Sequence, residues 1–317
     1  MIKKVLVILG STSSGKSSLA VKIAKNFKGE IISVDSRQVF KDMDLGTGKV
    51  KGRWKKIAGR KVFIYKDVPH YLIDFVNPEN DYNISHFKKD CEKKILEIIE
   101  HGKMPILCGG TGFWIQTIID NVNFPQVQPD PKLRKDLNSY SVSELFELLI
   151  KLDRNRAKNI DAKNRARLIR AIEIAKNLGK VPIVKTDKKS NSRKIKSNLI
   201  KFLQIGIPVD KDSLTEKIKN RLGKRFNDGM IEEILSLDEK YKLSPEKIQV
   251  FGIAYALVPS YKKGEITKRE LFDQICQAEK KYAKRQLTWF KKDPRIFWSD
   301  DYSRIEKEIR KFLNQKS

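Results

Sequence analysis

The sequence predicts an α/β protein with a doubly wound parallel sheet and a helical insertion. First, four short apolar runs have the composition of buried parallel strands; they are residues 5–9, 30–34, 104–108 and 202–207. Second, the first three runs are separated by stretches long enough for the crossovers that parallel strands require. Third, a glycine- and serine-rich motif follows the first run directly and leads into a helical pattern.

That motif predicts a phosphate-binding loop. The segment Gly10-Ser11-Thr12-Ser13-Ser14-Gly15-Lys16-Ser17 fits the pattern G-x-x-x-x-G-K-[ST] between a strand and a helix. In this context the loop N–H groups and the helix N-terminus face phosphate, Lys16 neutralises its oxygens, and the Ser17 hydroxyl can hold Mg²⁺. We therefore expect a P-loop NTPase-like core that binds a nucleotide or another di- or triphosphate. Kinases, GTPases, helicases and transferases all share this loop.

Polar segments also follow the second and third strands, and they should meet the loop at one sheet edge. They are Asp35-Ser36-Arg37-Gln38 and Gly109-Gly110-Thr111-Gly112. The third strand is not followed by a Walker-B carboxylate, and the sequence has no Asn-Lys-x-Asp guanine motif, which argues against a helicase and a GTPase. The loop is thus a candidate site for a diphosphate leaving group.

The organisation predicted is a core over residues 1–124, a helical insertion over 125–200, and a return to the core with C-terminal helices over 201–317. Helical patterns cover 143–152 and 165–178, and a helix with one solvated face covers 303–314. Residues 180–201 carry eight basic side chains against Asp187 alone. This segment is either a solvated loop or a contact to a phosphate backbone, and the sequence does not decide between them.

Composition favours a polyanionic partner. The 317 residues include 66 Lys and Arg against 39 Asp and Glu, a net charge of +27 with a pI near 9.8. Nucleic acid explains this surplus better than a lysine-rich background, and a membrane surface explains it less well, because no long basic amphipathic helix stands out.

The cysteines and histidines favour neither a disulfide framework nor a zinc site. Their positions are far apart or lack metal-ligand spacing: Cys91, Cys108, Cys276, His70, His86 and His101. The apolar run at the N-terminus ends at Leu9 in the phosphate loop, so it does not predict a signal peptide. No stretch approaches the roughly 20 apolar residues of a membrane span. We expect a cytoplasmic protein without membrane association.

Seven segments, in order, resemble the tRNA dimethylallyltransferases. They are 10–17, Ser33-Val34-Asp35-Ser36-Arg37-Gln38-Val39-Phe40, Met43-Asp44-Leu45-Gly46-Thr47, Pro69-His70-Tyr71-Leu72-Ile73-Asp74, 109–112, Arg167-Leu168-Ile169-Arg170-Ala171-Ile172-Glu173 and Ala283-Lys284-Arg285-Gln286-Leu287-Thr288-Trp289-Phe290. The zinc-finger ligands that some members carry beyond this core are missing, so the chain looks like the bacterial type.

The resemblance implies transfer of a dimethylallyl group from dimethylallyl diphosphate to N6 of adenosine 37, next to the anticodon of tRNA. By similarity Asp35 is the base, Thr111 bonds the departing oxygen, and Lys16 stabilises the diphosphate. Residues 10–17 and Arg221 would hold the diphosphate, with Mg²⁺ on Ser17. We expect a monomer that binds the anticodon stem-loop and flips the reacting base into its pocket.

Other residues are implied in tRNA contacts. By similarity they are Asp35, Ser36, Arg37, Gln38, Thr111, Arg134, Arg167, Lys284, Arg285 and Gln286. Trp289 and Phe290 could stack on bases, although aromatic residues in such positions more often belong to the core.

One segment departs from the family. Phe251-Gly252-Ile253-Ala254-Tyr255 stands where members usually have Ile-Gly-Tyr-Lys/Arg-Glu, and Gln249 replaces a frequent arginine. This puts tRNA contacts from the segment in doubt.

Three other functions compete with tRNA prenyl transfer. A small-molecule or nucleoside kinase has the same loop, an adenylate prenyltransferase shares the loop and Asp35, and a non-catalytic RNA-binding protein would fit the charge.

Overall fold

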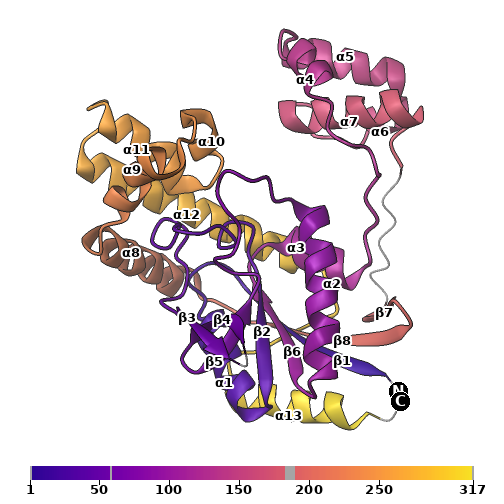
Figure 1. Ribbon diagram of the computed structural model, residues 1–317, viewed down its shortest axis with the longest axis vertical. Helices are drawn as coiled ribbons and strands as arrows, with labels where there is room; N and C mark the ends of the chain where they lie inside the picture. The colour runs from indigo at the N-terminus through magenta and orange to yellow at the C-terminus, as the bar shows by residue number, and fades with distance from the viewer. Residues whose placement is uncertain (1, 58, 183–189, 316–317) are drawn as a thin grey trace. The chain divides into compact units, whose positions relative to one another are not determined.

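The computed structural model describes residues 2–57, 59–182 and 190–315 (Figure 1). The chain divides into two compact units: residues 1–121 together with 187–317, and residues 122–186. Within the described residues the first unit contains the β-sheet and the second consists of helices and loops.

One mixed sheet runs through the first unit. Its described strands are β1 (Lys3–Leu9), β2 (Gly29–Val34), β3 (Arg53–Ile57), β4 (Arg60–Tyr65), β5 (Val68–Tyr71), β6 (Met104–Gly109), β7 (Ser192–Ile195), β8 (Asn198–Gly206) and β9 (Ile296–Trp298). They lie in the order β3-β4-β5-β2-β6-β1-β8-β7, and β9 pairs with the end of β8. The central strands are parallel, whereas β3, β4 and β7 are joined by antiparallel pairing. The four predicted strands and the α/β fold class are confirmed.

The described helices are divided between the two units. Those of the first unit are α1 (Lys16–Asn26), α2 (Ile84–Glu100), α3 (Gly112–Ile119), α8 (Lys211–Asn227), α9 (Met230–Tyr241), α10 (Pro245–Gln249), α11 (Ile253–Lys262), α12 (Lys268–Phe290) and α13 (Tyr302–Asn314). Those of the second are α4 (Pro131–Leu137), α5 (Val142–Leu152), α6 (Arg154–Ala157) and α7 (Arg165–Leu178).

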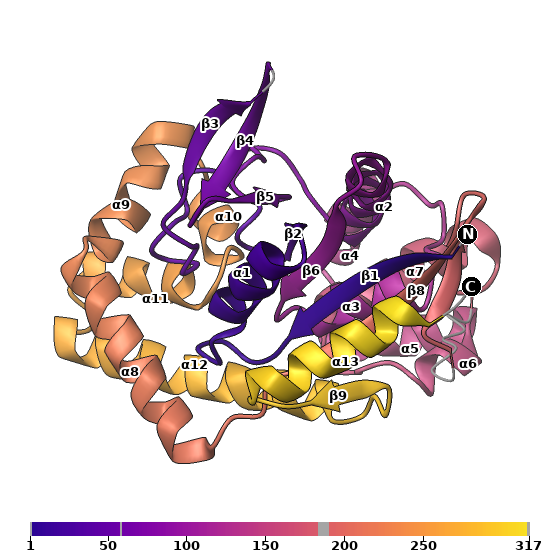
Figure 2. The same cartoon turned by 90° about the horizontal axis from the view of Figure 1, so that it is seen from below.

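Side chains of β1 alternate between two hydrophobic cores, as the two-residue period of a strand requires. Leu6 and Ile8 pack with residues of α1 and α13, while Val7 and Leu9 pack with residues of α2, α3 and the helices from α8 to α12. Figure 2 shows α1 and α13 against the sheet. Burying each such side chain stabilises the fold by about 1.5–3 kcal/mol, so the two cores fix the strand ends that follow β1, β2 and β6.

The helical unit has its own core. Leu145 and Leu149 of α5 pack with Leu168 and Ile172 of α7, which confirms the helices predicted at 143–152 and 165–178. A capping box begins α5: Ser141 Oγ accepts the Glu144 N–H, and the Glu144 carboxylate accepts the Ser141 N–H.

A buried carboxylate also stabilises this unit. Glu173 accepts hydrogen bonds from Arg134 and Arg170 and from the Asp130 N–H, at 2.7–3.0 Å. Burial raises the pKa of Glu173, but these hydrogen bonds outweigh that effect and bring the pKa down to about 2. Arg134, predicted to contact tRNA, is therefore engaged in an ion pair of its own unit.

The boundary of the insertion differs from the prediction. Its compact unit spans 122–186 instead of 125–200, because residues 192–200 pair with the core sheet as β7 and the start of β8. Ile195 and Ile200 of this hairpin are buried in the core of the first unit. Several positions between 192 and 200 are basic, so the alternation of apolar and polar residues that is typical of a strand was not recognised in the sequence.

The basic stretch at 180–201 is only partly described. Lys185, Asp187, Lys188 and Lys189 lie outside the described residues. Arg193 is buried, pairs with Glu92 at 2.6 Å and donates a hydrogen bond to the Asn121 side chain. Arg193 is thus neither a solvated residue nor a phosphate contact, whereas Lys194 is exposed.

No helix among the described residues has both the length and the apolar character needed to cross a membrane.

Candidate active site

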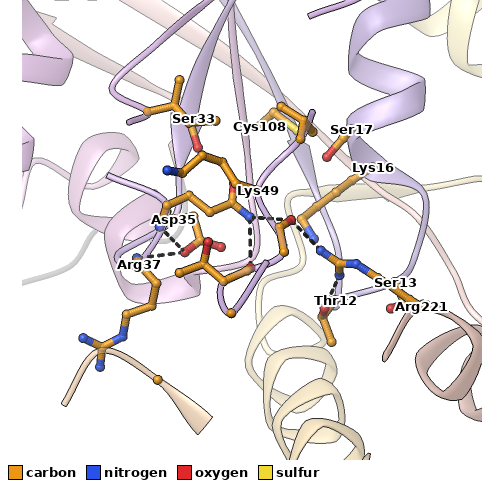
Figure 3. A pocket seen from close by; sticks show the side chains of 18 of the residues that line it. Thr12, Ser13, Lys16, Ser17, Ser33, Asp35, Arg37, Lys49, Cys108 and Arg221 are labelled. Atoms are coloured by element: carbon orange, nitrogen blue, oxygen red, sulfur yellow. Dashed lines mark hydrogen bonds between the residues drawn. The ribbon is translucent and has the colours of Figure 1, made fainter. Parts of the chain in front are cut away.

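A cavity of about 770 Å³ lies where β1, β2 and β6 end (Figure 3). Its wall includes most of the phosphate loop, the segment 35–38 after β2, the segment 46–51, and side chains from α8 and α12. In Figure 3, Thr12, Lys16 and Arg221 lie on one side of this cavity and Asp35 and Arg37 on the other. The sheet therefore brings together the strand ends singled out in the sequence.

The phosphate loop has the backbone that its glycines permit. Gly15 takes a left-handed φ of 88° just before α1 begins at Lys16. The Ser18 and Leu19 N–H groups bond the Gly15 carbonyl, whereas those of Lys16 and Ser17 have no main-chain acceptor among the described residues. Lys16 Nζ donates to the Ser11 carbonyl at 3.1 Å. Ser13 Oγ is buried at the cavity wall and has no hydrogen-bond partner among the described residues. A loop that leaves a hydroxyl and helix N–H groups without acceptors fits an anionic ligand.

Two cations converge on this loop. Arg221 of α8 donates to Thr12 Oγ1 at 2.9 Å and to the Gly48 carbonyl at 2.6 Å. Burial lowers the pKa of Lys16 and of Arg221, and each is lowered further by a neighbouring guanidinium, Arg221 for Lys16 and Arg225 for Arg221. Lys16 and Arg221 are half-buried, and two neighbouring cations repel one another, which favours binding of an anion between them.

Asp35 closes a turn and also faces the cavity. Its Oδ1 accepts the N–H groups of Arg37 at 2.9 Å and Gln38 at 3.3 Å, while Oδ2 accepts no hydrogen bond from a described residue. The Ser36 N–H donates to Thr111 Oγ1 at 3.3 Å, so the segments after β2 and β6 are joined next to Asp35. One carboxylate oxygen thus holds the turn and the other stays available to a ligand.

The next-to-last residue of β6, Cys108, is a thiol and not a carboxylate. Cys108 lies beside Lys16 and Ser17; burial raises the pKa of this thiol to about 11, although Lys16 lowers it, so the thiol is neutral near pH 7. The residues described contain no cluster of three His, Cys, Asp or Glu that could hold a metal ion. The cavity does offer the Ser17 hydroxyl and the Asp35 carboxylate. Such a sparse set of oxygen donors fits Mg²⁺, which usually keeps several waters and binds through substrate phosphates.

Gln286 has a bracing role that the sequence did not indicate. Its side chain is buried, Oε1 accepts the Thr12 N–H at 2.8 Å, and Nε2 donates to the Gly110 carbonyl at 2.8 Å. It joins the phosphate loop to the segment before α3 and also lines the cavity, and its contact with tRNA stays a prediction. Its neighbours on α12, Lys284 and Arg285, are exposed, as α12 turns their side chains away from the core.

The remaining predicted residues fall in different places. Arg167 is exposed on α7 of the helical unit. Phe290 is buried in the core, whereas Trp289 is 43% exposed and meets Phe113 edge to face. Gln38 lines the cavity and its amide donates to the Gly48 carbonyl at 3.3 Å.

Sequence reasoning missed the side chains that hold the segment 43–49. The Glu233 carboxylate of α9 accepts the N–H groups of Asp44, Leu45 and Gly46 at 2.7–3.0 Å. Lys49 is buried and pairs with Asp44 and Asp74, both at 2.6 Å. Glu233 lies far from residues 44–46 in the chain and Asp74 lies far from Lys49, so no local pattern predicted these contacts.

Tyr282 of α12 was also missed. It lines the cavity beside Asp35, and burial raises the pKa of its phenol to about 12. The residues around Tyr282 are mostly charged, so the sequence pattern of this helix did not predict that the Tyr282 side chain faces the cavity.

The departing segment keeps a structural role. Tyr255 is fully buried, packs against Gly46 and donates to Glu233 Oε1 at 3.3 Å. Phe251, Gly252 and Ile253 line the cavity. The segment thus supports the cavity wall, with apolar side chains where the family usually has polar ones.

Known proteins resemble this chain over nearly all of its length. The IPP transferase family matches residues 38–293, and the isopentenyl transferase family matches residues 3–67. A tRNA dimethylallyltransferase 2 of Shewanella sediminis is 37% identical over 90% of this chain and 88% of its own length. A tRNA dimethylallyltransferase of Carboxydothermus hydrogenoformans is 35% identical over 99% of this chain and 98% of its own.

Solved structures of other proteins also resemble this chain. A tRNA isopentenylpyrophosphate transferase of Bacillus halodurans is 30% identical, with a TM-score of 0.66 over 99% of this chain and 96% of its own. A eukaryotic dimethylallyltransferase acting on tRNA has a TM-score of 0.72 over 99% of this chain and 80% of its own; at 23% identity it supports the fold alone. With the family match and these relatives, the chain belongs to the IPP transferase family.

Proposed function

We propose that this protein transfers a dimethylallyl group from dimethylallyl diphosphate to N6 of adenosine 37 in the anticodon stem-loop of tRNA. One cavity carries this proposal, because it holds two half-buried cations, Lys16 and Arg221, opposite the carboxylate of Asp35. Its relatives with the same span are named for dimethylallyl transfer to tRNA.

The cation side suits the diphosphate. Lys16, Arg221, the Ser13 hydroxyl and the open N–H groups at the start of α1 supply donors for a group that gains negative charge as its C–O bond breaks. Ser17 would hold Mg²⁺, which would neutralise further charge on the diphosphate. No Walker-B carboxylate prepares a water, so the site is better suited to a leaving diphosphate than to nucleotide hydrolysis.

The acid side suits the nucleophile. The exocyclic amine of adenine is weakly basic and attacks effectively only if a base removes its proton. As the N6–C1 bond forms, that proton passes to Asp35 Oδ2, and the C1–O electron pair leaves with the diphosphate. Thr111 would bond the departing oxygen, and its contact with the Ser36 N–H keeps it beside Asp35.

The acceptor is a macromolecule in this proposal. A net charge of +27 favours RNA over a free nucleotide. Arg37 lines the cavity next to Asp35 and would contact the flipped base or its neighbours, while Arg167, Lys284 and Arg285 are exposed for phosphate contacts. We further propose a cytoplasmic monomer.

Asp35→Asn tests the proposal. Asparagine keeps the oxygen that accepts the Arg37 and Gln38 N–H groups, so the turn is preserved while the base is lost. Transfer to unmodified tRNA, measured by nucleoside mass spectrometry, should fall by about 10²–10⁴ with little change in tRNA affinity. Asp35→Ala, which also loses the turn, is the matched control. Wild-type turnover by the asparagine variant, or phosphate transfer from ATP by the wild type, would refute the assignment.

A further inference from the structure

The charged residues of the hairpin formed by β3 and β4 are all basic. Residues 48–66 contain eight Lys or Arg and no Asp or Glu, in a chain whose overall ratio is 66 to 39. All five residues of β3 are exposed, as are the first two of β4. The fold therefore presents a strip of cations at the edge of its sheet.

Most of these cations lack an acidic partner. Lys51, at the start of the hairpin, pairs with Asp228 at 2.8 Å. Lys55, Lys56 and Lys61 form no ion pair with any described residue, and Lys56 lies directly opposite Lys61 across the two strands. Like charges at directly opposed positions destabilise a hairpin. Such a pair is unfavourable in the free protein and becomes favourable when an anion lies between the two side chains.

The hairpin starts at the wall of the active-site cavity. Lys51, just before β3, and Tyr65, at the end of β4, both line that cavity. Figure 2 shows β3 and β4 projecting from the body of the first unit. At about 3.4 Å per residue, the five steps from Lys51 to Lys56 carry the basic strip roughly 17 Å outward. That reach exceeds the size of a bound diphosphate, and it matches a polymer whose reacting nucleotide enters the cavity.

An exposed aromatic ring accompanies the charge. Trp54 is 43% exposed, and its ring is fixed by Phe63 at 5.7 Å and by a hydrogen bond to Asp74 Oδ2 at 2.7 Å. Trp54 lies on the same face of the strands as Lys56 and Lys61, two residues along. Cations beside a rigid aromatic surface are typical of single-stranded nucleic-acid binding.

We propose that the β3–β4 hairpin is an RNA-binding arm that contacts phosphates of the nucleotides flanking the one in the cavity. The inference rests on the proposed tRNA substrate. The competing explanation is that lysines on an edge strand only prevent pairing with other chains. That explanation accounts for the charge on β3, but it does not require Lys61 of β4 or the opposed lysine pair.

The test compares two triple variants of the full chain. K55Q/K56Q/K61Q removes the arm's cations, while K103Q/K307Q/K311Q removes three exposed lysines away from the cavity wall. Equilibrium binding of an unmodified tRNA transcript is measured from 50 to 300 mM salt, together with the KM for dimethylallyl diphosphate and the thermal midpoint. We expect the arm variant to bind tRNA at least about tenfold more weakly at 0.1 M salt, with a log–log salt slope smaller by about 2. The KM for dimethylallyl diphosphate should not change.

The outcomes separate this inference from the proposed function. If the arm variant matches the control variant in affinity and slope, the arm is refuted, even when the wild type modifies tRNA. Aggregation of the arm variant with an unchanged slope also refutes it and supports edge protection. If the wild type transfers no prenyl group to tRNA, the proposed function fails, but a selective loss of slope in the arm variant still supports RNA binding by the hairpin.

Discussion

Replacing Glu173 by glutamine removes the charge that orders the N-terminal part of the helical unit. The Glu173 side chain is 1% exposed, and its two oxygens accept four hydrogen bonds, three of them from Arg134 and Arg170. Glutamine keeps the shape but turns an amide N–H₂ toward one guanidinium. We expect Glu173→Gln to destabilise this unit without changing its helices.

The pKa of Glu173 sets the magnitude. It falls from the ordinary value of 4.5 to about 2 in the folded protein. The difference between these two pKa values, converted at about 1.36 kcal/mol per pH unit, corresponds to about 3 kcal/mol of stability near pH 7. Because the folded-state pKa is depressed, this contribution is fully present above pH 4.5 and is lost as the pH falls from 4.5 toward 2.

Two measurements give this loss of stability. Hydrogen exchange of the full chain is followed on peptides from α4, α5 and α7, and urea unfolding is recorded from pH 7 to pH 3. Glu173→Gln should cost about 3 kcal/mol at pH 7, and the difference from wild type should shrink below pH 4.5. Glu147→Gln makes the same chemical change at an exposed position of α5 and should cost little. A cost below about 1 kcal/mol at pH 7, or a cost independent of pH, would contradict the reasoning.

Three further predictions concern the site and its charge. Lys16→Ala and Thr111→Ala should each lower prenyl transfer, by about 10²–10³ for the lysine, with tRNA affinity unchanged in filter binding. Glu233→Gln should cost about 1–3 kcal/mol in urea unfolding, because one oxygen that accepts main-chain N–H groups becomes a donor; an unchanged midpoint would refute this. Neutralising Lys188, Lys189 and Lys194 together should flatten the salt dependence of tRNA binding by up to about 0.7–0.9 per lost phosphate contact, and an unchanged slope would mean a solvated loop.

Local patterns predicted the centre of the fold. The phosphate loop and the four apolar strands are read from neighbouring residues, since burial on both faces of a parallel sheet demands continuous apolar runs. The hairpin of β3 and β4 was missed because most of its exposed positions are basic and two, Trp54 and Ile57, are apolar, so neither strand alternates clearly. β7 was missed for the same reason, although Ile195 enters the core.

The site was predicted at the strand ends and missed where helices enter it. Asp35 and Thr111 follow strands, so topology alone places them together. Glu233 and Tyr282 come from helices far along the chain, and which side of a charged helix faces inward depends on packing that the sequence does not state. Arg221 was placed by resemblance alone, because its helix position would otherwise predict a solvated side chain.

Gln286 braces the phosphate loop at the cavity wall, and its substitution separates this role from the predicted tRNA contact. It lies beside Lys284 and Arg285 in one polar segment, yet its amide joins the Thr12 N–H to the Gly110 carbonyl. Gln286→Glu keeps an acceptor for Thr12 but sets a carboxylate oxygen against the carbonyl, whereas Gln286→Leu loses both hydrogen bonds. Because the brace sets the phosphate loop against the segment that carries Thr111, both variants should lower kcat for prenyl transfer while the salt slope of tRNA binding stays at its wild-type value. If a variant instead weakens tRNA binding and flattens that slope while kcat is unchanged, Gln286 contacts the RNA and is not a brace for catalysis.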